Sequence, residues 1–497
     1  MLTRPDETTR LLGADEETAP APAADPLTWT SPTDHGNPKN WTPSRKWTCA
    51  MLVSILTLIA PTAASMVVPA MPALARDLGI ESKSFLQLTM SAFVLGWTAG
   101  PLILGPLSEV FGRATILHVG NVGFIVFNIL CGLVRNQYAF LFLRFISGFC
   151  GSGPTSLGTG VLSDLWTSEE RGISLAIYTV LPLLGPAAGP MVAGYIVQYY
   201  EWPYIFYLCS LVSFVVLVPG LVFMPETFGP VILRRRQAEK LRHAGASALS
   251  ILAAQDAQLH TTKQRIRKGL ARPFILLGTQ PIIQVLAVYF GFYFGLYQLS
   301  IASYQAMWRD QYGMTPVQAS ANYVSISLGL LVGCQIAGTL NDKIYRALKR
   351  RNGDTDLPEY RVWLMIPAAI LVPAGLLVFG WAAVAKAHWL LPNVGMATAC
   401  VGLVMAFLCM QAYVMDSYPV YAASAQGALT VLRALAAFSM PIMGPSVIKA
   451  VGYGWFSTLL AAVAVTLGIG APTVLYWKGA HLRAMSPYAA GQVNLER

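Results

Sequence analysis

The chain has 497 residues, of which 55% are hydrophobic and only 12% are charged. A soluble domain carries about a quarter charged residues, so this composition excludes an ordinary soluble protein and predicts one that lies in a bilayer. The net charge of +10 would suit a nucleic-acid partner in a soluble protein. Here the excess lies in loops between apolar segments, as in cytoplasmic membrane loops, so we expect no nucleic-acid partner.

The apolar segments predict the fold. Residues 1–46 are polar and rich in Pro, Asp, Glu and Thr, which predicts a disordered tail. Segments of about 20 residues, the length that crosses the hydrocarbon core, then recur along the chain. We predict spans near 47–70, 85–107, 114–134, 138–163, 173–198, 203–224, 274–302, 317–340, 362–385, 389–414, 424–447 and 453–477. The fold class is therefore an all-α membrane protein of twelve transmembrane helices in two six-helix bundles.

Basic residues predict the orientation. Most of the 34 Lys and Arg lie in the tails and in the loops on the same side as the tails, so both termini are expected to be cytoplasmic. The chain then divides into five parts. These are a cytoplasmic tail at 1–46, an N-terminal bundle at 47–227, a basic central loop at 228–272, a C-terminal bundle at 273–477 and a cytoplasmic tail at 478–497.

The two halves repeat a loop pattern. The run after the second span is Gly105-Pro-Leu-Ser-Glu109-Val-Phe-Gly112-Arg113, and the run after the eighth is Gly338-Thr-Leu-Asn-Asp342-Lys343. Gly105 would let the helix end approach a neighbour closely. A carboxylate at Glu109 can cap a helix N-terminus, and Arg113 is expected to pair with Asp164 at the end of the fourth span. The simpler alternative is an ordinary charged inner loop.

Two arginines lie inside predicted spans, whereas no Asp or Glu does. Arg144 lies about two turns into the fourth span, and Arg433 lies in the eleventh. A charge inside a span is costly and marks a functional site by default. For Arg144 the alternative is a side chain that extends back to the outer interface.

The fifth span is rich in small residues and prolines. Its motif contains Gly185, Pro186, Gly189, Pro190 and Gly194. Small residues four apart form a face for close helix contact, and prolines bend a helix. Generic helix packing is the alternative to a functional motif.

These motifs together resemble the major facilitator superfamily. The run 105–113 resembles its loop signature, Arg144 matches its second signature, and the fifth span resembles the signature of its antiporters. Other stretches narrow the resemblance to the fungal drug:proton antiporter-1 family of polyamine, multidrug and metabolite exporters. They are Asn37-Pro38-Lys39-Asn40-Trp41, Met224-Pro225-Glu226-Thr227, Pro358-Glu-Tyr-Arg361 and Asp416-Ser-Tyr418-Pro419. Gln280-Pro281 stands where relatives commonly have Glu-Pro.

The resemblance implies a secondary transporter in which two bundles rock around a midplane site. It also implies a cytoplasmic gate that latches the inner face. The gate residues would be Gly105, Glu109, Gly112, Arg113, Asp164, Asp342 and Asp416. Residues expected on the substrate or proton pathway are Arg144, Arg433, Gln284, Gln298, Asn322, Gln335 and Gln411. The glutamines and Asn322 could equally bridge helices.

Two further groups of residues have open roles. Aromatic side chains crowd the seventh span, at Tyr289, Phe290, Phe292, Tyr293, Phe294 and Tyr297. They line a cavity or face neighbours and lipid. His118 has an ordinary pKa suited to carrying a proton, but a lone histidine in a span is more often a hydrogen-bonded packing residue.

We therefore expect an exporter of a small organic compound, with protons entering in exchange. Two arginines and no acids in the spans favour an organic acid or secondary metabolite, because guanidinium pairs with carboxylate. The alternatives are broad multidrug or polyamine efflux and, more distantly, a transporter-like sensor. No enzyme motif, cofactor motif or metal-ligand spacing is found. We expect a monomer in the cell membrane, although Glu7-Thr-Thr-Arg-Leu11-Leu12 resembles a vacuolar or endosomal sorting signal.

Overall fold

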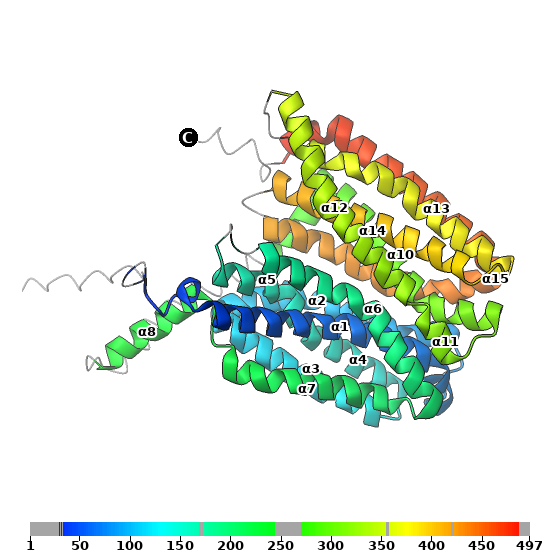
Figure 1. Ribbon diagram of the computed structural model, residues 1–497, viewed down its shortest axis with the longest axis horizontal. Helices are drawn as coiled ribbons and strands as arrows, with labels where there is room; N and C mark the ends of the chain where they lie inside the picture. The colour runs from blue at the N-terminus through cyan, green and yellow to red at the C-terminus, as the bar shows by residue number, and fades with distance from the viewer. Residues whose placement is uncertain are drawn as a thin grey trace, which may run out of the picture.

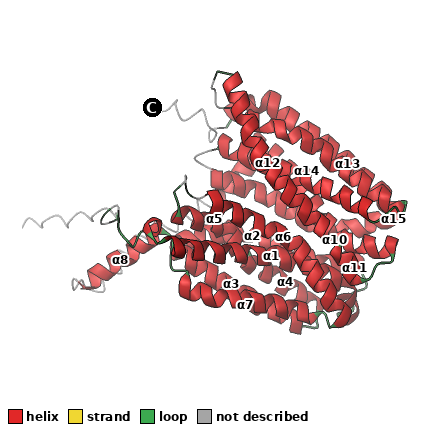
Figure 2. Cartoon of the chain, in the orientation of Figure 1, coloured by secondary structure: helices red, strands yellow, loops and turns green. Residues whose placement is uncertain are grey.

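The computed structural model describes residues 29, 31, 33–167, 170, 172–243, 270–353, 357–418 and 422–486. Within these residues all regular elements are helices (Figure 2). The sorting-signal motif at residues 7–12 lies outside the described part of the chain. The helices form two groups, with the N-terminal half below and the C-terminal half above in Figure 1.

The N-terminal half contains six membrane crossings. Its helices are α1 (Pro43–Asp77), α2 (Lys83–Phe111), α3 (Arg113–Leu133), α4 (Gln137–Gly151), α5 (Gly153–Leu165), α6 (Gly172–Tyr199) and α7 (Pro203–Phe223). The short helices α4 and α5 follow each other at Ser152 and together occupy the predicted fourth span. Pro154 explains the break, because it has no N–H to donate to the carbonyl oxygen of Cys150.

The C-terminal half also contains six crossings. Its helices are α10 (Pro281–Tyr312), α11 (Pro316–Ala321), α12 (Val324–Arg351), η3 (Pro358–Leu364), α13 (Met365–Val384), α14 (Leu390–Ser417) and α15 (Ala422–Ala484). The 63 residues of α15 turn at Gly452, whose φ is 79°, so α15 supplies two crossings. Ten of the described helices are long and apolar enough to span a membrane. The second leg of α15 and the pair α4–α5 complete the predicted twelve.

The structure differs from the prediction at the start of the seventh span and in the N-terminal tail. The seventh span was predicted to start at residue 274, but a separate helix, Leu270–Thr279, precedes α10. The break falls at Gln280, before Pro281, because proline cannot continue the ladder. Part of the predicted tail is also structured. The 3-10 helix η2 (Pro38–Asn40) precedes α1, and Asp34 pairs at 2.9 Å with Arg236 of α8 (Gly229–His243).

The small residues of α6 pack against α1. A Cβ added at Gly185 would lie 2.8 Å from Pro61 Cβ, and one added at Gly189 would lie 2.4 Å from Ser65 Oγ. Ser65 Oγ also donates a hydrogen bond to the Gly185 carbonyl at 3.3 Å. Gly194 instead meets the other half, because its added Cβ would lie 2.4 Å from Ser320 Oγ in α11. The glycines of this motif therefore permit close approach on two sides of α6.

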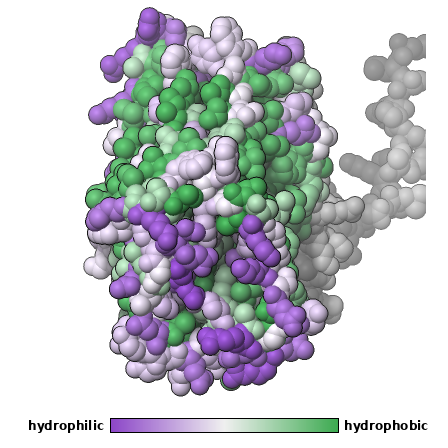
Figure 3. All heavy atoms as spheres, turned by 90° about the vertical axis from the view of Figure 1, so that its right-hand side faces the viewer, coloured by the Kyte–Doolittle hydropathy of each residue, from purple (hydrophilic) through white to green (hydrophobic). Residues whose placement is uncertain are grey.

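Contacts between the halves connect α6 with α11 and α12, and α2 with α15. Ser327 Oγ donates to the Leu183 carbonyl at 2.8 Å, and Ser84 Oγ lies 3.3 Å from Ser446 Oγ. At Gly427, nearer the cytoplasmic end, an added Cβ would lie 3.4 Å from a methyl carbon of Leu102. Figure 3 looks onto the opposite, outer end, where hydrophilic side chains gather chiefly over the N-terminal half.

The α1–α6 contact predicts the effect of a single methyl group. In Gly189→Ala the new Cβ would lie 2.6 Å from the backbone oxygen of Thr62, so α1 and α6 must separate. Overpacking of this kind costs about 1–3 kcal/mol. We expect a lower thermal midpoint for the detergent-solubilised protein, measured by fluorescence-detected size exclusion after heating. Gly338→Ala is the matched control, because its added Cβ meets no atom within 4 Å. Equal midpoints for the two variants would contradict the prediction.

Candidate functional site

Four helix ends meet at the cytoplasmic rim of the N-terminal half. Gly112 joins α2 to α3 with a φ of 101°, a conformation that side-chain-bearing residues rarely adopt. Arg113, the first residue of α3, donates from Nε to Asp164 Oδ2 at 2.5 Å. Its backbone N–H donates to Glu226 Oε1 at 2.9 Å. Glu226 follows α7, so α2, α3, α5 and α7 are held together here.

The structure corrects two expectations for this loop. Glu109 is exposed, and it is Glu226 that caps the N-terminus of α3. Gly105 has open space around it, since an added Cβ would meet nothing within 4 Å. The predicted Arg113–Asp164 contact is present. Glu226 was missed because its position 113 residues from Arg113 gives no local signal.

An equivalent network holds the rim of the C-terminal half. Arg361 of η3 donates to Asp342 at 2.7 Å and to Asp416 at 2.9 Å. Its guanidinium also lies 4.3 Å from the ring centroid of Tyr345. Asp342 and Asp416 were predicted gate residues, but the arginine that joins them was not. Its position offers a signal, because Arg361 precedes the ninth crossing as Arg113 precedes the third.

A buried ion pair ties the end of α15 to η3. Arg483 and Glu359 are 8% and 7% exposed, and two nitrogens of Arg483 donate to the two oxygens of Glu359. Tyr413 of α14 contributes its hydroxyl oxygen at 3.3 Å from Arg483. Both charged residues were predicted to lie in polar loop or tail segments. The pair instead closes the cytoplasmic end of the C-terminal half.

The ion pairs described at the two rims act within one half each. Arg113–Asp164 and Glu226 join helices of the N-terminal half, and Arg361 and Arg483 join helices of the C-terminal half. The gate residues predicted to latch the inner face therefore form, in this conformation, two networks that do not join one half to the other. Each network makes its own bundle rigid at the cytoplasmic end.

Arg144 is fully buried inside the N-terminal half. Its exposed fraction is 0%, which excludes a side chain that extends to the outer interface. Nε donates to the Thr89 carbonyl at 3.0 Å, and one terminal nitrogen donates to the Ala63 carbonyl at 3.3 Å. The guanidinium lies 4.4 Å from the ring centroid of Phe93. Arg144 thus joins α4 to α1 and α2 through backbone oxygens, and its guanidinium also lies 5.5 Å from the ring centroid of Phe206 in α7.

Arg433 lies on an aromatic surface of the C-terminal half. Its guanidinium carbon is 5.1 Å from the ring centroid of Phe294 and 5.5 Å from that of Phe290, both in α10. Phe407 of α14 packs edge-on against Phe290 at 5.0 Å. The Nε atom of Arg433 is buried and has no hydrogen-bond partner. We call Arg433, Phe290, Phe294 and Phe407 the Arg433 cluster.

Polar residues lie one turn from the Arg433 cluster on α10 and on α14. Gln298 is one turn beyond Phe294 on α10, is 2% exposed, and its amide nitrogen has no partner. Gln411 is one turn from Phe407 on α14. The backbone carbonyl of Gln411 accepts a hydrogen bond at 3.2 Å from the side-chain amide of Gln426, which lies two turns from Arg433 on α15. Gln426 was not predicted, because its role depends on the pairing of α14 with α15.

Three other predicted pathway residues lie elsewhere. Gln284 is exposed and donates to the Leu277 carbonyl at 3.0 Å, where it caps the helix before α10. Asn322 lies at the break between α11 and α12, and its side-chain oxygen accepts from Asn393 at 2.6 Å. Gln335 is exposed on α12. Of the predicted amide residues, only Gln298 and Gln411 lie one turn from a member of the Arg433 cluster on the same helix.

Four of the six aromatic residues predicted in the seventh span form two groups. Phe290 and Phe294 belong to the Arg433 cluster. Tyr289 and Tyr293 stack on each other at 4.6 Å within the core of the C-terminal half, and the Tyr293 hydroxyl donates to the Ala464 carbonyl. His118 lies 3.5 Å from the Met224 carbonyl oxygen, the position of a packing histidine.

Comparison with known proteins places this arrangement in a family. The profile of the Major Facilitator Superfamily matches residues 53–441. The chain belongs to the major facilitator superfamily. It is 44% identical to the MFS-type transporter oryF of Aspergillus oryzae, over 97% of this chain and 98% of that protein. It is 36% identical to the efflux pump vrtL of Penicillium aethiopicum, over 94% and 92% of the two chains. This facilitator is therefore a membrane transporter from a group with fungal members.

Solved facilitator structures share its fold. A D-xylose-proton symporter matches with a TM-score of 0.64 at 14% identity, over 87% of this chain and 97% of that one. The human organic anion transporter MFSD10 matches with a TM-score of 0.57 at 16% identity, over 87% and 100%. At these identities the likeness shows the twelve-helix fold alone.

The Gly112 turn in this facilitator predicts a clear difference between two glycines of one motif. Gly112→Ala places a side chain at positive φ and puts its Cβ 2.0 Å from Glu226 Oε2, and such backbone strain costs about 1–3 kcal/mol. Gly105→Ala, with open space around it, is the matched control. We expect Gly112→Ala to lower the thermal midpoint and the yield of monodisperse protein, and Gly105→Ala to leave both unchanged. A tolerated Gly112→Ala would show that the turn is not required.

The Glu359–Arg483 pair predicts an asymmetric response to single and double substitution. Arg483→Ala leaves Glu359 buried without a cation, which costs about 3–5 kcal/mol. The double variant Glu359→Gln with Arg483→Met removes both charges, so we expect it to recover most of the lost thermal stability. Arg350→Ala, at an exposed position of α12, serves as the control for loss of a positive charge. If the double variant were no more stable than Arg483→Ala, the pairing argument would be wrong.

Proposed function

We propose that this facilitator exports a small organic acid across the cell membrane, with protons entering in exchange. The observation that carries the proposal is Arg433, a cation among aromatic rings whose buried Nε has no partner. A carboxylate is the ligand that suits it, because guanidinium offers a planar fork of N–H donors. Rings of Phe290, Phe294 and Phe407 would contact the apolar body of the same molecule.

The two arginines inside the spans have different environments. Arg144 spends two of its donors on the backbone carbonyls of Thr89 and Ala63, and only its Nη1 is buried without a partner. Arg433 forms no ion pair among the described residues, and desolvation of an unpaired charge is costly. A substrate carboxylate would supply the missing partner. A polyamine would instead bring a second cation to this place.

Exchange and direction rest on the family. Several relatives are named efflux pumps, and α6 carries the glycine-proline motif that resembles the signature of antiporters. The two bundles, each tied internally at its cytoplasmic end, suit alternating access by rocking of one half against the other. Export from the cytoplasm across the plasma membrane is the proposed direction.

A matched set of three probes tests the substrate class. Proteoliposomes with purified protein would be offered benzoate, benzamide and benzylamine, which share a ring and differ in charge. We expect saturable transport of benzoate only, driven by an imposed proton gradient and abolished by a protonophore. Arg433→Gln should lower benzoate transport about tenfold to a hundredfold, the value of a charge-assisted hydrogen bond. Arg235→Gln on exposed α8 surface should have no effect.

Three outcomes would contradict parts of the proposal. Transport of benzylamine or spermidine without benzoate would favour the multidrug or polyamine alternative. Benzoate transport that is insensitive to the protonophore would remove proton exchange while leaving the substrate class intact. Normal benzoate transport by both Arg433→Gln and Arg144→Gln would show that neither arginine inside the spans binds the substrate carboxylate.

A further inference from the structure

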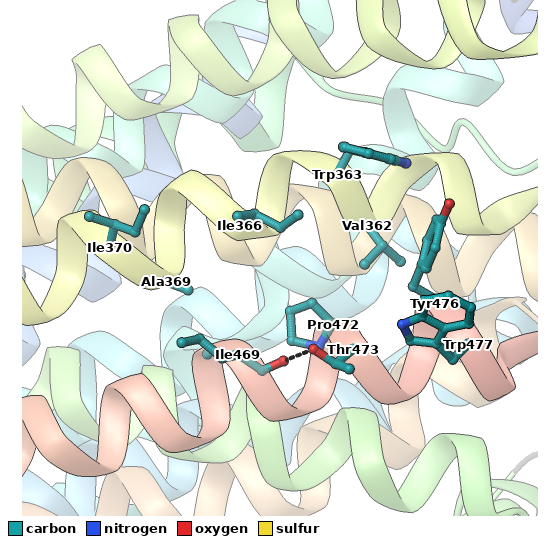
Figure 4. Close-up of a pocket in the computed structure, with 11 residues that line it drawn as sticks. Val362, Trp363, Ile366, Ala369, Ile370, Ile469, Pro472, Thr473, Tyr476 and Trp477 are labelled. Atoms are coloured by element: carbon teal, nitrogen blue, oxygen red, sulfur yellow. Dashed lines mark hydrogen bonds between the residues drawn. The ribbon is translucent and has the colours of Figure 1, made fainter. Parts of the chain in front are cut away.

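An apolar groove lies on the outside of the C-terminal half, away from the Arg433 cluster. It separates η3 and α13 from the second leg of α15 and has a volume of about 340 Å³. Figure 4 shows Ile366 and Ile370 on one wall and Ile469 and Pro472 on the other. Ala369 forms part of the floor and is 3% exposed. Ala369 faces Gly468 at the contact between the two helices. Because both residues are small, no side chain fills the space above this contact, and the larger residues on either side form the walls of the groove.

The groove has no polar side chain free along its length. Thr473, the one aliphatic hydroxyl residue among those that line it, donates to the Ile469 carbonyl of its own helix at 2.7 Å. Polar atoms occur at one end, where Trp363, Tyr476 and Trp477 lie together. Trp363 packs edge-on against Tyr476 at 5.8 Å. An elongated apolar ligand with one polar end matches this distribution.

Two aromatic clusters place the groove within the bilayer. Trp363 begins the ninth crossing, and Trp381 near its other end packs against Trp455 at 5.7 Å. Residues 363 to 381 span about 27 Å at 1.5 Å per residue, close to the hydrocarbon thickness. Trp and Tyr prefer the two membrane interfaces. The aromatic end of the groove therefore lies at the cytoplasmic interface, and its apolar length lies in the cytoplasmic leaflet.

The outer walls of the groove are continuous with a lipid-facing surface. Ile370 and Ile469 are 64% and 57% exposed, and Val378 and Val384 continue the exposed apolar face of α13. In a membrane protein such a face is covered by lipid chains. We propose that the groove binds an acyl chain of a cytoplasmic-leaflet glycerophospholipid, with the ester region of that lipid at Trp363, Tyr476 and Trp477. The indole N–H and phenol groups there are suitable donors to ester and phosphate oxygens.

Photo-crosslinking tests this site with the full-length protein. The protein would be placed in phosphatidylcholine nanodiscs that contain a phosphatidylcholine with a diazirine in one acyl chain, and crosslinked peptides would be mapped by mass spectrometry. We expect crosslinks to residues 362–370 and 468–477 to exceed severalfold those to α7, whose Leu211, Val215 and Val222 present an ordinary exposed apolar face. Ile366→Trp, which fills the groove from an exposed wall position, should lower the groove crosslinks severalfold.

Val215→Trp on α7 is the matched control, and it should leave the groove crosslinks unchanged. Equal crosslinking of the groove and of α7 would overturn the proposal, because it would indicate annular lipid only. Loss of the groove crosslinks on addition of unlabelled sterol would also overturn it, by assigning the groove to a sterol. Neither result would depend on what the transporter carries.

Discussion

The main constraint on this protein is that a charge buried in a membrane protein needs a partner from its own surroundings. The chain meets this constraint in three ways. Acids and bases pair at the cytoplasmic rims, as in Arg113–Asp164 and Glu359–Arg483. Arg144 takes backbone carbonyls as its partners. Arg433 lies against aromatic faces and forms no ion pair among the described residues, and the proposed function rests on this difference.

The rim networks of the two halves are alike in one contact and differ in another. Arg113 and Arg361 stand before the third and ninth crossings, and each binds an acid at the end of the following helix, Asp164 or Asp416. The contact made by the end of the last helix differs between the halves in the charge of the residue that it supplies. At the end of α7 the acid Glu226 faces the N-terminus of α3, where a carboxylate is favoured by the helix dipole. At the end of α15 the base Arg483 binds Glu359 instead. Both solutions tie the last helix of a half to its third.

The sequence predicted the fold well, because span length and basic loops act residue by residue along the chain. The breaks at Ser152 and Gln280 were less visible, since a proline within a predicted span is compatible with either a bend or a break. The site was predicted in part. A rule based on neighbouring residues selected Glu109, whereas the acid that caps α3 lies 113 residues from Arg113. The Arg433 cluster needs α10, α14 and α15 side by side, and that arrangement is set by packing that a single sequence does not record.

The charged residues at the cytoplasmic rims form ion pairs, whereas Arg433 inside the C-terminal half forms none among the described residues. This difference bears on how transport would proceed. Each rim network joins helices of one half, so rocking need not break any ion pair described at the rims. The Arg433 cluster belongs wholly to the C-terminal half, so it stays assembled while that half moves. When the halves close over an empty site, Arg433 is sealed in a low-dielectric region without a counter-ion, and this is costly. A bound carboxylate removes that cost. Under the proposed function, the substrate therefore lowers the barrier to its own passage, because it binds the closed state more tightly than the open one.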